Sequence, residues 1–306
     1  MNSYVYGPVP SRRLGLSLGL SIIPFKTCTL DCVYCQCGRT TRKTLRRESF
    51  YPVEDILAQV RQAVKTARPD FITFSGEGEP TLNCDIGRLI RRLKQEHTIP
   101  VAVITNSTLF TDPAVRRDLY AADLVVPSLD AADQRTFARV NRGHRNLRIA
   151  GIIDALVTFR RYYHGQIWLE IMLVKDCNDS VEHLMHLRKA VHRIRPDRVH
   201  LNTVVRPPAE RNARPLSEDD LEQVRCLFGP GAEIASSPFR RRRRRFRGDP
   251  VQAVLEFVQR RPATAKDLEH SLGIPAPELD ATLRRLVRRR RIRRVDFWGK
   301  VFYEPV

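Results

Sequence analysis

The chain has 306 residues, of which 42% are hydrophobic and 28% are charged, and its formal net charge at pH 7 is +19. This length and composition predict a globular protein with one large domain and a small second one, and they argue against a disordered or fibrous chain. No stretch approaches the ~18 uninterrupted apolar residues of a membrane-spanning helix, and the first residues lack the apolar core of a signal peptide. We therefore expect no membrane segment and a cytoplasmic location, where thiols stay reduced.

The positive charge is concentrated toward the C-terminal end. Residues 239–306 contain 19 Lys and Arg against 8 Asp and Glu. Such a segment is typical of a solvated surface that keeps a protein soluble, and also of a surface that attracts a polyanion, most commonly nucleic acid. A high use of arginine can also reflect the base composition of a genome.

Short apolar runs alternate with longer amphipathic segments along the first two thirds of the chain. Helical spacing of apolar residues predicts helices at Val53–Thr66, Ile86–Glu96, Pro113–Tyr120, Ala150–Tyr162 and Val181–Ile194. Strands are expected at Leu18–Phe25, Phe71–Phe74, Val101–Thr105, Leu124–Val126, Ile167–Val174 and Val199–Asn202. This alternation predicts the α/β class with a parallel sheet, either open and doubly wound or a barrel of fewer than eight units.

Polar or glycine-rich segments follow the predicted strands. They are a cysteine-rich loop, then SGEGEP, TNST, PSLD, KDCND and NTVVRPP. Because the carboxyl ends of parallel strands meet at one edge of a sheet, we expect these segments to converge and form a site.

The sequence changes character after Pro238. We expect a core domain over residues 1–238, an Arg-rich linker over 239–248 and a second domain over 249–306. Three helices are predicted at Pro250–Gln259, Ala265–Leu272 and Ala276–Arg289, and a hairpin at Ile292–Asp296 and Lys300–Tyr303. This order matches a winged helix-turn-helix.

The third of these predicted helices is rich in arginine. It carries Arg284, Arg285, Arg288, Arg289 and Arg290, as a helix that enters a nucleic-acid groove would. Winged helices also bind peptides and other protein domains, so the sequence leaves both partners open.

Three cysteines stand in the spacing C-x3-C-x2-C, at Cys28, Cys32 and Cys35. A structural zinc site needs four ligands, and a 4Fe–4S cluster needs one ligand for each iron. Three thiolates therefore leave one iron open for a substrate or cofactor. Cys37 could instead close a zinc site, although paired cysteine knuckles usually lie farther apart, and unligated thiols are the third reading.

The remaining cysteines give a weaker signal. Cys37 also suits the role of a small buried residue, which is the common position of a free cysteine. Cys84, Cys177 and Cys226 are scattered and lack the spacing of a second cluster.

Taken together, these segments resemble the radical S-adenosylmethionine (SAM) enzymes over about residues 4–210. The resemblance is greatest to a branch that begins YGPVPSRRLG and is related to the wyosine-synthesising enzymes. It rests on many separate blocks in one order: Tyr6–Gly19, Cys28–Cys35, Phe74–Leu82, Ile104–Thr108, Pro127–Arg142, Ile171–Asp179 and Leu201–Glu210.

The resemblance implies a partial (βα)6 barrel and two cofactors. Cys28, Cys32 and Cys35 would hold three irons of a 4Fe–4S cluster, and S-adenosylmethionine would chelate the fourth. Reduction by a donor such as flavodoxin or ferredoxin would cleave the cofactor to methionine and a 5′-deoxyadenosyl radical, which abstracts a hydrogen atom. The basic C-terminal segment and the wyosine-like branch favour tRNA as substrate.

Two alternatives are kept open at this point. A peptide or protein substrate is the second possibility for an enzyme of this kind. A different class is an iron–sulfur regulator that binds DNA through the winged helix. The GEGEP motif and the polar segments after the strands argue against that regulator, because a sensor needs neither.

The resemblance also implies roles for individual residues. The family's glycine-rich motif, which meets the methionine amine, appears here as Ser75-Gly76-Glu77-Gly78-Glu79, and the sequence leaves open which carboxylate acts. Tyr34 takes the aromatic position that meets the adenine, while ribose, carboxylate or substrate contacts fall to Asn106, Ser128, Asp130, Lys175 and Asn202. Two roles remain open for three arginines: binding an anionic group of the substrate, or forming ion pairs at the surface. They are Arg12, Arg13 and Arg206.

Overall fold

The structure is a computed structural model, and it describes residues 4–11, 13–235 and 248–306. Arg12, the Arg240–Arg245 run and most of the expected linker over 239–248 lie outside the described residues. The described residues therefore do not test the domain boundary predicted there.

One eight-stranded sheet forms the centre of the molecule, in the order β1-β2-β5-β6-β7-β8-β9-β10. Neighbours run parallel from β2 to β10, while β1 pairs with β2 in the antiparallel direction. The strands are β1 (Val5–Ser11), β2 (Gly15–Leu20), β5 (Phe71–Phe74), β6 (Val101–Thr105), β7 (Leu124–Pro127), β8 (Gln166–Leu173), β9 (Arg198–Thr203) and β10 (Ala232–Ile234). Two short parallel strands, β3 (Thr27–Cys28) and β4 (Arg42–Lys43), flank the cysteine-rich loop.

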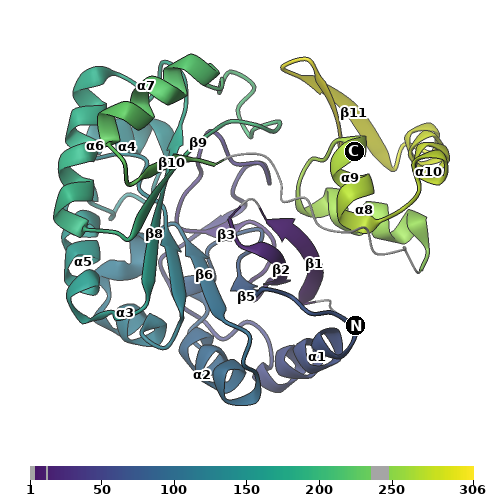
Figure 1. Cartoon of the computed structure of the whole chain (residues 1–306), viewed down its shortest axis with the longest axis horizontal. Coiled ribbons are helices and arrows are strands. Elements are labelled where there is room, and N and C mark those ends of the chain that lie inside the picture. Colours follow the sequence, from purple (N-terminus) through teal and green to yellow (C-terminus); the bar gives the residue numbers. More distant parts are fainter. Residues whose placement is uncertain (1–3, 12, 236–247) are drawn as a thin grey trace.

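Helices pack along the sheet and bury its apolar strands. Figure 1 shows α1, α2, α3, α5 and α6 in an arc along one side of the sheet. The helices of this part are α1 (Val53–Thr66), α2 (Ile86–Glu96), α3 (Pro113–Leu119), α4 (Gln134–Val140), α5 (Ile149–Tyr162), α6 (Val181–Ile194) and α7 (Glu218–Phe228), with 3₁₀ turns η1 (Pro80–Leu82) and η2 (Thr108–Thr111). The strands read as almost continuous apolar runs because a parallel sheet covered by helices is buried. β7, for example, is buried at all four residues.

Most of the predicted elements are confirmed. Six have the expected bounds, namely Val53–Thr66, Phe71–Phe74, Ile86–Glu96, Val101–Thr105, Val181–Ile194 and Ala265–Leu272. Several others differ by one or two residues at an end, where helix and strand termini are weakly determined.

One strand was predicted wrongly. The expected strand Leu18–Phe25 is replaced by β2 (Gly15–Leu20), which ends well before Pro24. Proline has no backbone N–H to donate to a central ladder, so the segment after β2 leaves the sheet. The sequence reading also missed β1, α4, α7 and β10, whose short or mixed sequences carry little periodicity.

The C-terminal unit follows as α8 (Pro250–Arg260), α9 (Ala265–Leu272), α10 (Ala276–Arg288), β11 (Ile292–Phe297) and β12 (Lys300–Pro305). Thr264 begins α9 with a capping box, in which its hydroxyl accepts from Asp267 N and the Asp267 carboxylate accepts from Thr264 N. The unit has its own apolar core, which includes Leu268, Leu283 and Ile292.

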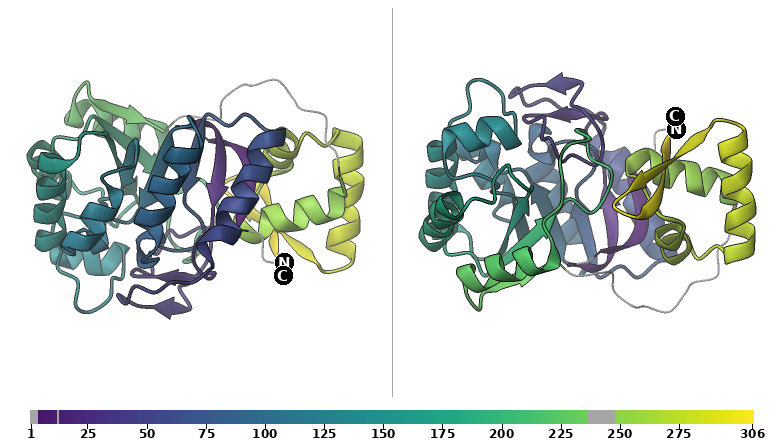
Figure 2. Two further views of the ribbon diagram at one scale, coloured as in Figure 1. Left: turned by 90° about the horizontal axis from the view of Figure 1, so that it is seen from below. Right: turned by 90° about the horizontal axis from the view of Figure 1, so that it is seen from above.

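This C-terminal unit lies against the β1 edge of the large sheet, as Figures 1 and 2 show from three directions. Val9 of β1 packs against the apolar core of the unit, and Phe297 of β11 packs against a cluster that contains Val33 and Tyr34 of the cysteine-rich loop. None of the helices among the described residues combines the length and apolar character needed to cross a lipid bilayer.

Candidate functional site

The cysteines of the C-x3-C-x2-C motif line a single cavity, and two of their thiols meet side-chain amides. Asn106 Nδ2 donates to Cys28 Sγ at 3.4 Å, and Asn141 Nδ2 donates to Cys32 Sγ at 3.5 Å. Burial, reinforced by a nearby carboxylate, raises the pKa of Cys28 to about 12 and also raises the pKa of Cys32. The thiolate form at these positions therefore needs a cation beside it, and an iron ion would provide one.

The pKa of Cys35 is shifted in the opposite direction, below its ordinary value. A hydrogen bond with the Cys37 thiol, together with the Lys26 ammonium, lowers the pKa of Cys35 to about 5. Lys26 Nζ lies 3.1 Å from Cys35 Sγ. Cys37 Sγ in turn donates to the Arg260 carbonyl oxygen at 3.3 Å, so Cys37 lies between the motif and helix α8.

This donor set fits a 4Fe–4S cluster. Three thiols on one loop face the cavity, and each meets an N–H donor of the kind that tunes cluster sulfurs. Within the residues that the structure describes, no three His, Cys, Asp or Glu side chains are gathered closely enough to hold a single metal ion.

The glycine-rich segment after β5 runs close to the cysteine-rich loop. Gly76 has φ of +140°, a conformation that side chains disfavour. A Cβ on Gly78 would lie 2.1 Å from the Thr27 carbonyl oxygen, which allows no room for a methyl group. Glycines here thus let the backbone of the motif approach the strand that carries Cys28.

Gly78→Ala is expected to lower the free energy of unfolding by about 1–3 kcal/mol, the typical cost of overpacking a tight site. The added Cβ meets backbone rather than a flexible side chain, so the strand or the loop has to move. Gly231→Ala is the matched control, because a Cβ there meets no atom within 4 Å. Thermal unfolding of both variants tests the prediction, and equal midpoints for the two would contradict it.

The structure separates the two carboxylates of the motif. Glu79 is 1% exposed, and its oxygens accept from Thr81 N at 3.1 Å, Thr81 Oγ1 at 2.6 Å, Thr105 Oγ1 at 2.7 Å and Asn106 N at 2.7 Å. Burial raises the pKa of Glu79, and these hydrogen bonds only partly offset that rise. With its oxygens so engaged, Glu79 fastens the loop after β5 to the loop after β6.

Glu77 has a more accessible setting. Its carboxylate accepts from Ser21 Oγ at 2.5 Å and lies 3.8 Å from the Arg260 guanidinium of α8. Both carboxylates line the cavity, but only Glu79 is enclosed by four hydrogen-bond donors. Of the two carboxylates between which the sequence could not choose, Glu77 is therefore the better placed to receive a ligand cation.

Asp130, which is buried, and Tyr34, which is partly buried, belong to one hydrogen-bond network. The Tyr34 hydroxyl donates to Asp130 Oδ2, which also accepts from Asn141 Nδ2 at 2.7 Å, while Asp130 Oδ1 accepts from Met172 N at 2.9 Å. Asp130 is 3% exposed, and burial raises its pKa. These contacts assign Asp130 to holding the cysteine-rich loop in place, in addition to any ligand contact.

The other predicted residues divide into two groups. Ser128, Asn106 and Asn202 line the cavity. Lys175 does not, because its ammonium group pairs with Asp220 at 3.0 Å and with Asp179 at 3.8 Å near the start of α7. Among the predicted cofactor residues, Asp130 does not line the cavity either, but it accepts a hydrogen bond from Tyr34, which does.

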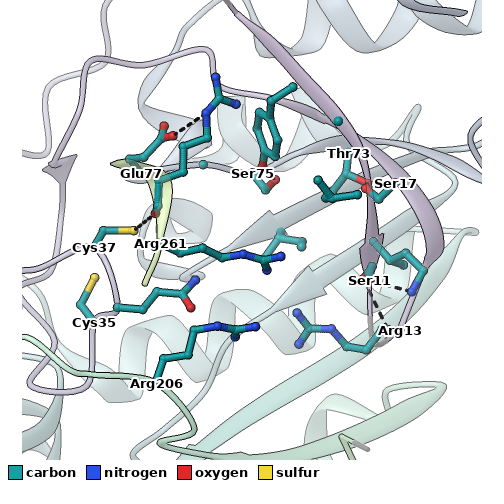
Figure 3. A pocket seen from close by; sticks show the side chains of 18 of the residues that line it. Ser11, Arg13, Ser17, Cys35, Cys37, Thr73, Ser75, Glu77, Arg206 and Arg261 are labelled. Carbon is teal, nitrogen blue, oxygen red and sulfur yellow. Dashed lines mark hydrogen bonds and ion pairs between the residues drawn. The ribbon is translucent and has the colours of Figure 1, made fainter. Parts of the chain in front are cut away.

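The cavity itself has a volume of about 780 Å³ and is formed by both parts of the chain. Figure 3 shows Cys35, Cys37 and Glu77 on one side, Arg13 on the opposite side, and the Arg206 and Arg261 side chains extending into the space between them. Helices α8 and α9 contribute Phe257, Arg260 and several further residues to its wall.

The sequence reading missed two arginines at the C-terminal end of α8, Arg260 and Arg261. Arg260 and Arg261 lie more than 200 positions after the cysteines, and no local pattern relates them to the motif. Only the docking of α8 beside β1 brings them to the cavity, where the Arg260 guanidinium stacks 4.2 Å from the Tyr6 ring centroid.

Comparison with known proteins agrees with this geometry. The family model "Radical SAM superfamily" matches residues 22–188. A UPF0026 protein of Methanocaldococcus jannaschii is 31% identical over 97% of this chain and 94% of its own length. A Brachyspira hyodysenteriae protein named "GTPase Obg" is 35% identical over 98% of this chain, which spans only 45% of that relative.

More distant matches share part of the sequence or the fold. A "Dual-specificity RNA methyltransferase RlmN" of Nitratidesulfovibrio vulgaris is 29% identical over 60% of this chain and 51% of its own length. The solved structure of a radical SAM methyltransferase from Sphaerobacter thermophilus has a similar fold, with a TM-score of 0.55 and 21% identity over 71% of this chain and 66% of that one. Members of the superfamily use a 4Fe–4S cluster and S-adenosylmethionine. The α/β fold, the mostly parallel sheet and the three-cysteine loop therefore belong to an enzyme of the radical SAM superfamily, in the group of UPF0026 proteins.

Proposed function

We propose that this enzyme holds its cluster through Cys28, Cys32 and Cys35 and acts on RNA. When bound, the cluster would supply the electron that splits S-adenosylmethionine into methionine and a 5′-deoxyadenosyl radical. A reduced flavodoxin or ferredoxin is the donor we expect. The need for a reduced cluster and free thiolates favours the cytoplasm as the location.

The cofactor contacts that we propose follow from the cavity wall. Glu77 presents a carboxylate to the methionyl ammonium, and Gly76 and Gly78 keep that part of the cavity open. Asn106, Ser128 and Asn202 supply polar groups for the ribose and the carboxylate. The hydrogen-bonded Tyr34–Asp130 pair fixes the loop near the adenine.

The chain also supplies the means to shield a reactive radical. Val33, Tyr34 and Phe297 belong to one apolar cluster, which packs the β11–β12 hairpin against the cysteine-rich loop. We propose that this packing limits the entry of water beside the cluster.

RNA is favoured as the substrate by the surface of the C-terminal unit. Arg284, Arg285, Arg288 and Arg289 are exposed along and just after α10, and Trp298 at the hairpin tip is 62% exposed. Arginine and an exposed aromatic ring bind phosphate and stack on bases. We interpret the large sheet as a partial (βα)6 barrel of the wyosine-related branch, and the C-terminal unit, residues 249–306, as a winged helix.

The test is anaerobic reconstitution with iron and sulfide, followed by S-adenosylmethionine and dithionite. We expect 5′-deoxyadenosine, detected by chromatography, and a larger yield when total tRNA is added. The same concentration of a peptide mixture should leave the yield unchanged. An intact cluster that gives no 5′-deoxyadenosine would refute the radical chemistry, and stimulation by peptides alone would refute RNA as the substrate.

A further inference from the structure

Arg260, the last residue of α8, contacts both loops of the cofactor site. Its Nε lies 3.8 Å from Glu77 Oε1, and its carbonyl oxygen accepts from Cys37 Sγ at 3.3 Å. The guanidinium also stacks 4.2 Å from the ring centroid of Tyr6, whose hydroxyl is hydrogen-bonded to Ser75 Oγ at 2.7 Å. Arg260 therefore connects the C-terminal unit to the glycine-rich motif, at Ser75 and Glu77, and to the cysteine-rich loop.

The ion pair between Arg260 and Glu77 is a loose one. At 3.8 Å, Arg260 Nε and Glu77 Oε1 are too far apart for a hydrogen bond. Arg260 Nη1 is buried, and the described part of the chain offers it no hydrogen-bond partner. The other oxygen of the carboxylate, Oε2, accepts from Ser21 Oγ at 2.5 Å. The guanidinium thus neutralises the carboxylate without being fixed to it, and another cation can take its place.

Glu77 needs a cation beside it. Its side chain is only 11% exposed, so most of its charge is removed from water, and a carboxylate in that setting is costly without a partner of opposite charge. Arg260 is the partner that the C-terminal unit supplies. A second cation of this region, Lys26, is directed instead at Cys35 Sγ, 3.1 Å from its Nζ.

We propose that Arg260 competes with the methionyl ammonium of S-adenosylmethionine for Glu77. The inference rests on the proposed function, in which Glu77 receives that ammonium, and it adds a role for the C-terminal unit in cofactor binding. One carboxylate neutralises only one of two cations, and the second is repelled by the first. The guanidinium therefore leaves Glu77 when the ammonium arrives, and α8 then holds the motif less firmly. Because linkage is reciprocal, looser docking of α8 in turn strengthens cofactor binding.

Calorimetric titration of the reconstituted full chain with S-adenosylmethionine, without reductant, tests the competition. We expect Arg260→Ala to bind the cofactor roughly 3- to 30-fold more tightly, an effect between those of exposed and buried ion pairs. Arg260→Lys should stay within about threefold of the unmodified chain, because it keeps the competing charge. Unchanged or weaker binding by Arg260→Ala would overturn the proposal, and so would an equal gain in Arg260→Lys.

A second ligand separates competition from a cavity that has simply become more open. 5′-Methylthioadenosine has the nucleoside of the cofactor but lacks its ammonium group, so we expect Arg260→Ala and the unmodified chain to bind it equally. A gain for this ligand as large as that for S-adenosylmethionine would show that removal of the side chain only made room, and would overturn the competition.

Two further variants locate the effect at Glu77. Lys266→Ala removes an exposed charge of α9 that does not line the cavity, and it should change cofactor binding by less than about threefold. In a double-mutant cycle, Arg260→Ala should give no gain once Glu77 is alanine, because the carboxylate for which the two cations compete is gone. A gain in Lys266→Ala, or one that persists without Glu77, would show general repulsion and overturn the proposal.

Hydrogen exchange of the α8 amides gives a readout that does not depend on affinity. S-adenosylmethionine should speed this exchange several-fold in the unmodified chain, because the hold of Arg260 on the motif is lost. In Arg260→Ala that hold is already absent, so the cofactor should leave the exchange unchanged. The same response in both chains would overturn the link between α8 and the cofactor.

Failure of the proposed function gives different results. Cleavage of S-adenosylmethionine by the reduced, unmodified enzyme reports on the radical chemistry alone. Cofactor binding by Glu77→Ala as tight as that of the unmodified chain would remove the proposed ammonium contact. Weaker binding by Glu77→Ala, with no gain in Arg260→Ala, would leave that contact in place and remove only the competition.

Discussion

Replacement of Cys28, Cys32 or Cys35 by serine is expected to abolish the broad visible absorbance of the reconstituted cluster. Formation of 5′-deoxyadenosine should fall by more than roughly 100-fold, because loss of an outer partner of a metal ligand already costs 10- to 100-fold. Each of the three thiols lies in the cavity with its own N–H donor, so each is expected to be a ligand. Absorbance, iron analysis and product chromatography check the result.

Cys37→Ser decides whether three or four thiolates are ligands. Cys37 lies beside Cys35 and donates to Arg260 O, so its replacement should alter the loop but leave the iron content unchanged. Cys84→Ser is the matched control, because Cys84 is exposed and does not line the cavity. Loss of the cluster in Cys37→Ser, with Cys84→Ser intact, would contradict an open iron site.

Glu79→Ala is expected to lower the free energy of unfolding by about 3–5 kcal/mol, since each buried donor left without an acceptor costs about 1–3 kcal/mol. The change removes the acceptor of Thr81 N, Thr105 Oγ1 and Asn106 N at once. The loops after β5 and β6 should then separate, and Asn106 should lose its position beside Cys28. Chemical denaturation followed by circular dichroism measures the effect.

Two further variants, Glu54→Ala and Glu77→Ala, test whether the loss of stability is particular to Glu79. Glu54→Ala on α1 removes a carboxylate that is 56% exposed, and surface changes of this kind stay within about 0.5 kcal/mol. Glu77→Ala should weaken S-adenosylmethionine binding with a smaller loss of stability, because Glu77 faces the cavity. Equal stability of Glu79→Ala and Glu54→Ala would show that Glu79 is not a structural anchor.

The roles of individual polar residues depended on the contacts around them. Glu77 and Glu79 are two positions apart in the same motif, yet one lines the opening toward α8 and the other is enclosed by donors from η1 and β6. Lys175 follows a strand like the other predicted residues. Its ammonium group, however, pairs with Asp220 at the start of α7, and so it does not reach the cavity. Position after a strand indicated the correct edge of the sheet and could not indicate the direction of a side chain.

The sequence alone determined the cysteine motif, the βα alternation and the bounds of most helices. These features depend on residues that are close along the chain, such as the apolar stripe of α1 or the capping box of α9, so a local pattern contains them. Tertiary structure alone decided which carboxylate is enclosed by hydrogen-bond donors and that Arg260 and Arg261 reach the cavity. Those facts depend on how segments far apart in the chain pack. Apolar packing of the C-terminal unit against Val9 of β1, and of Phe297 in β11 against the cluster with Val33 and Tyr34, sets that arrangement without leaving a local pattern.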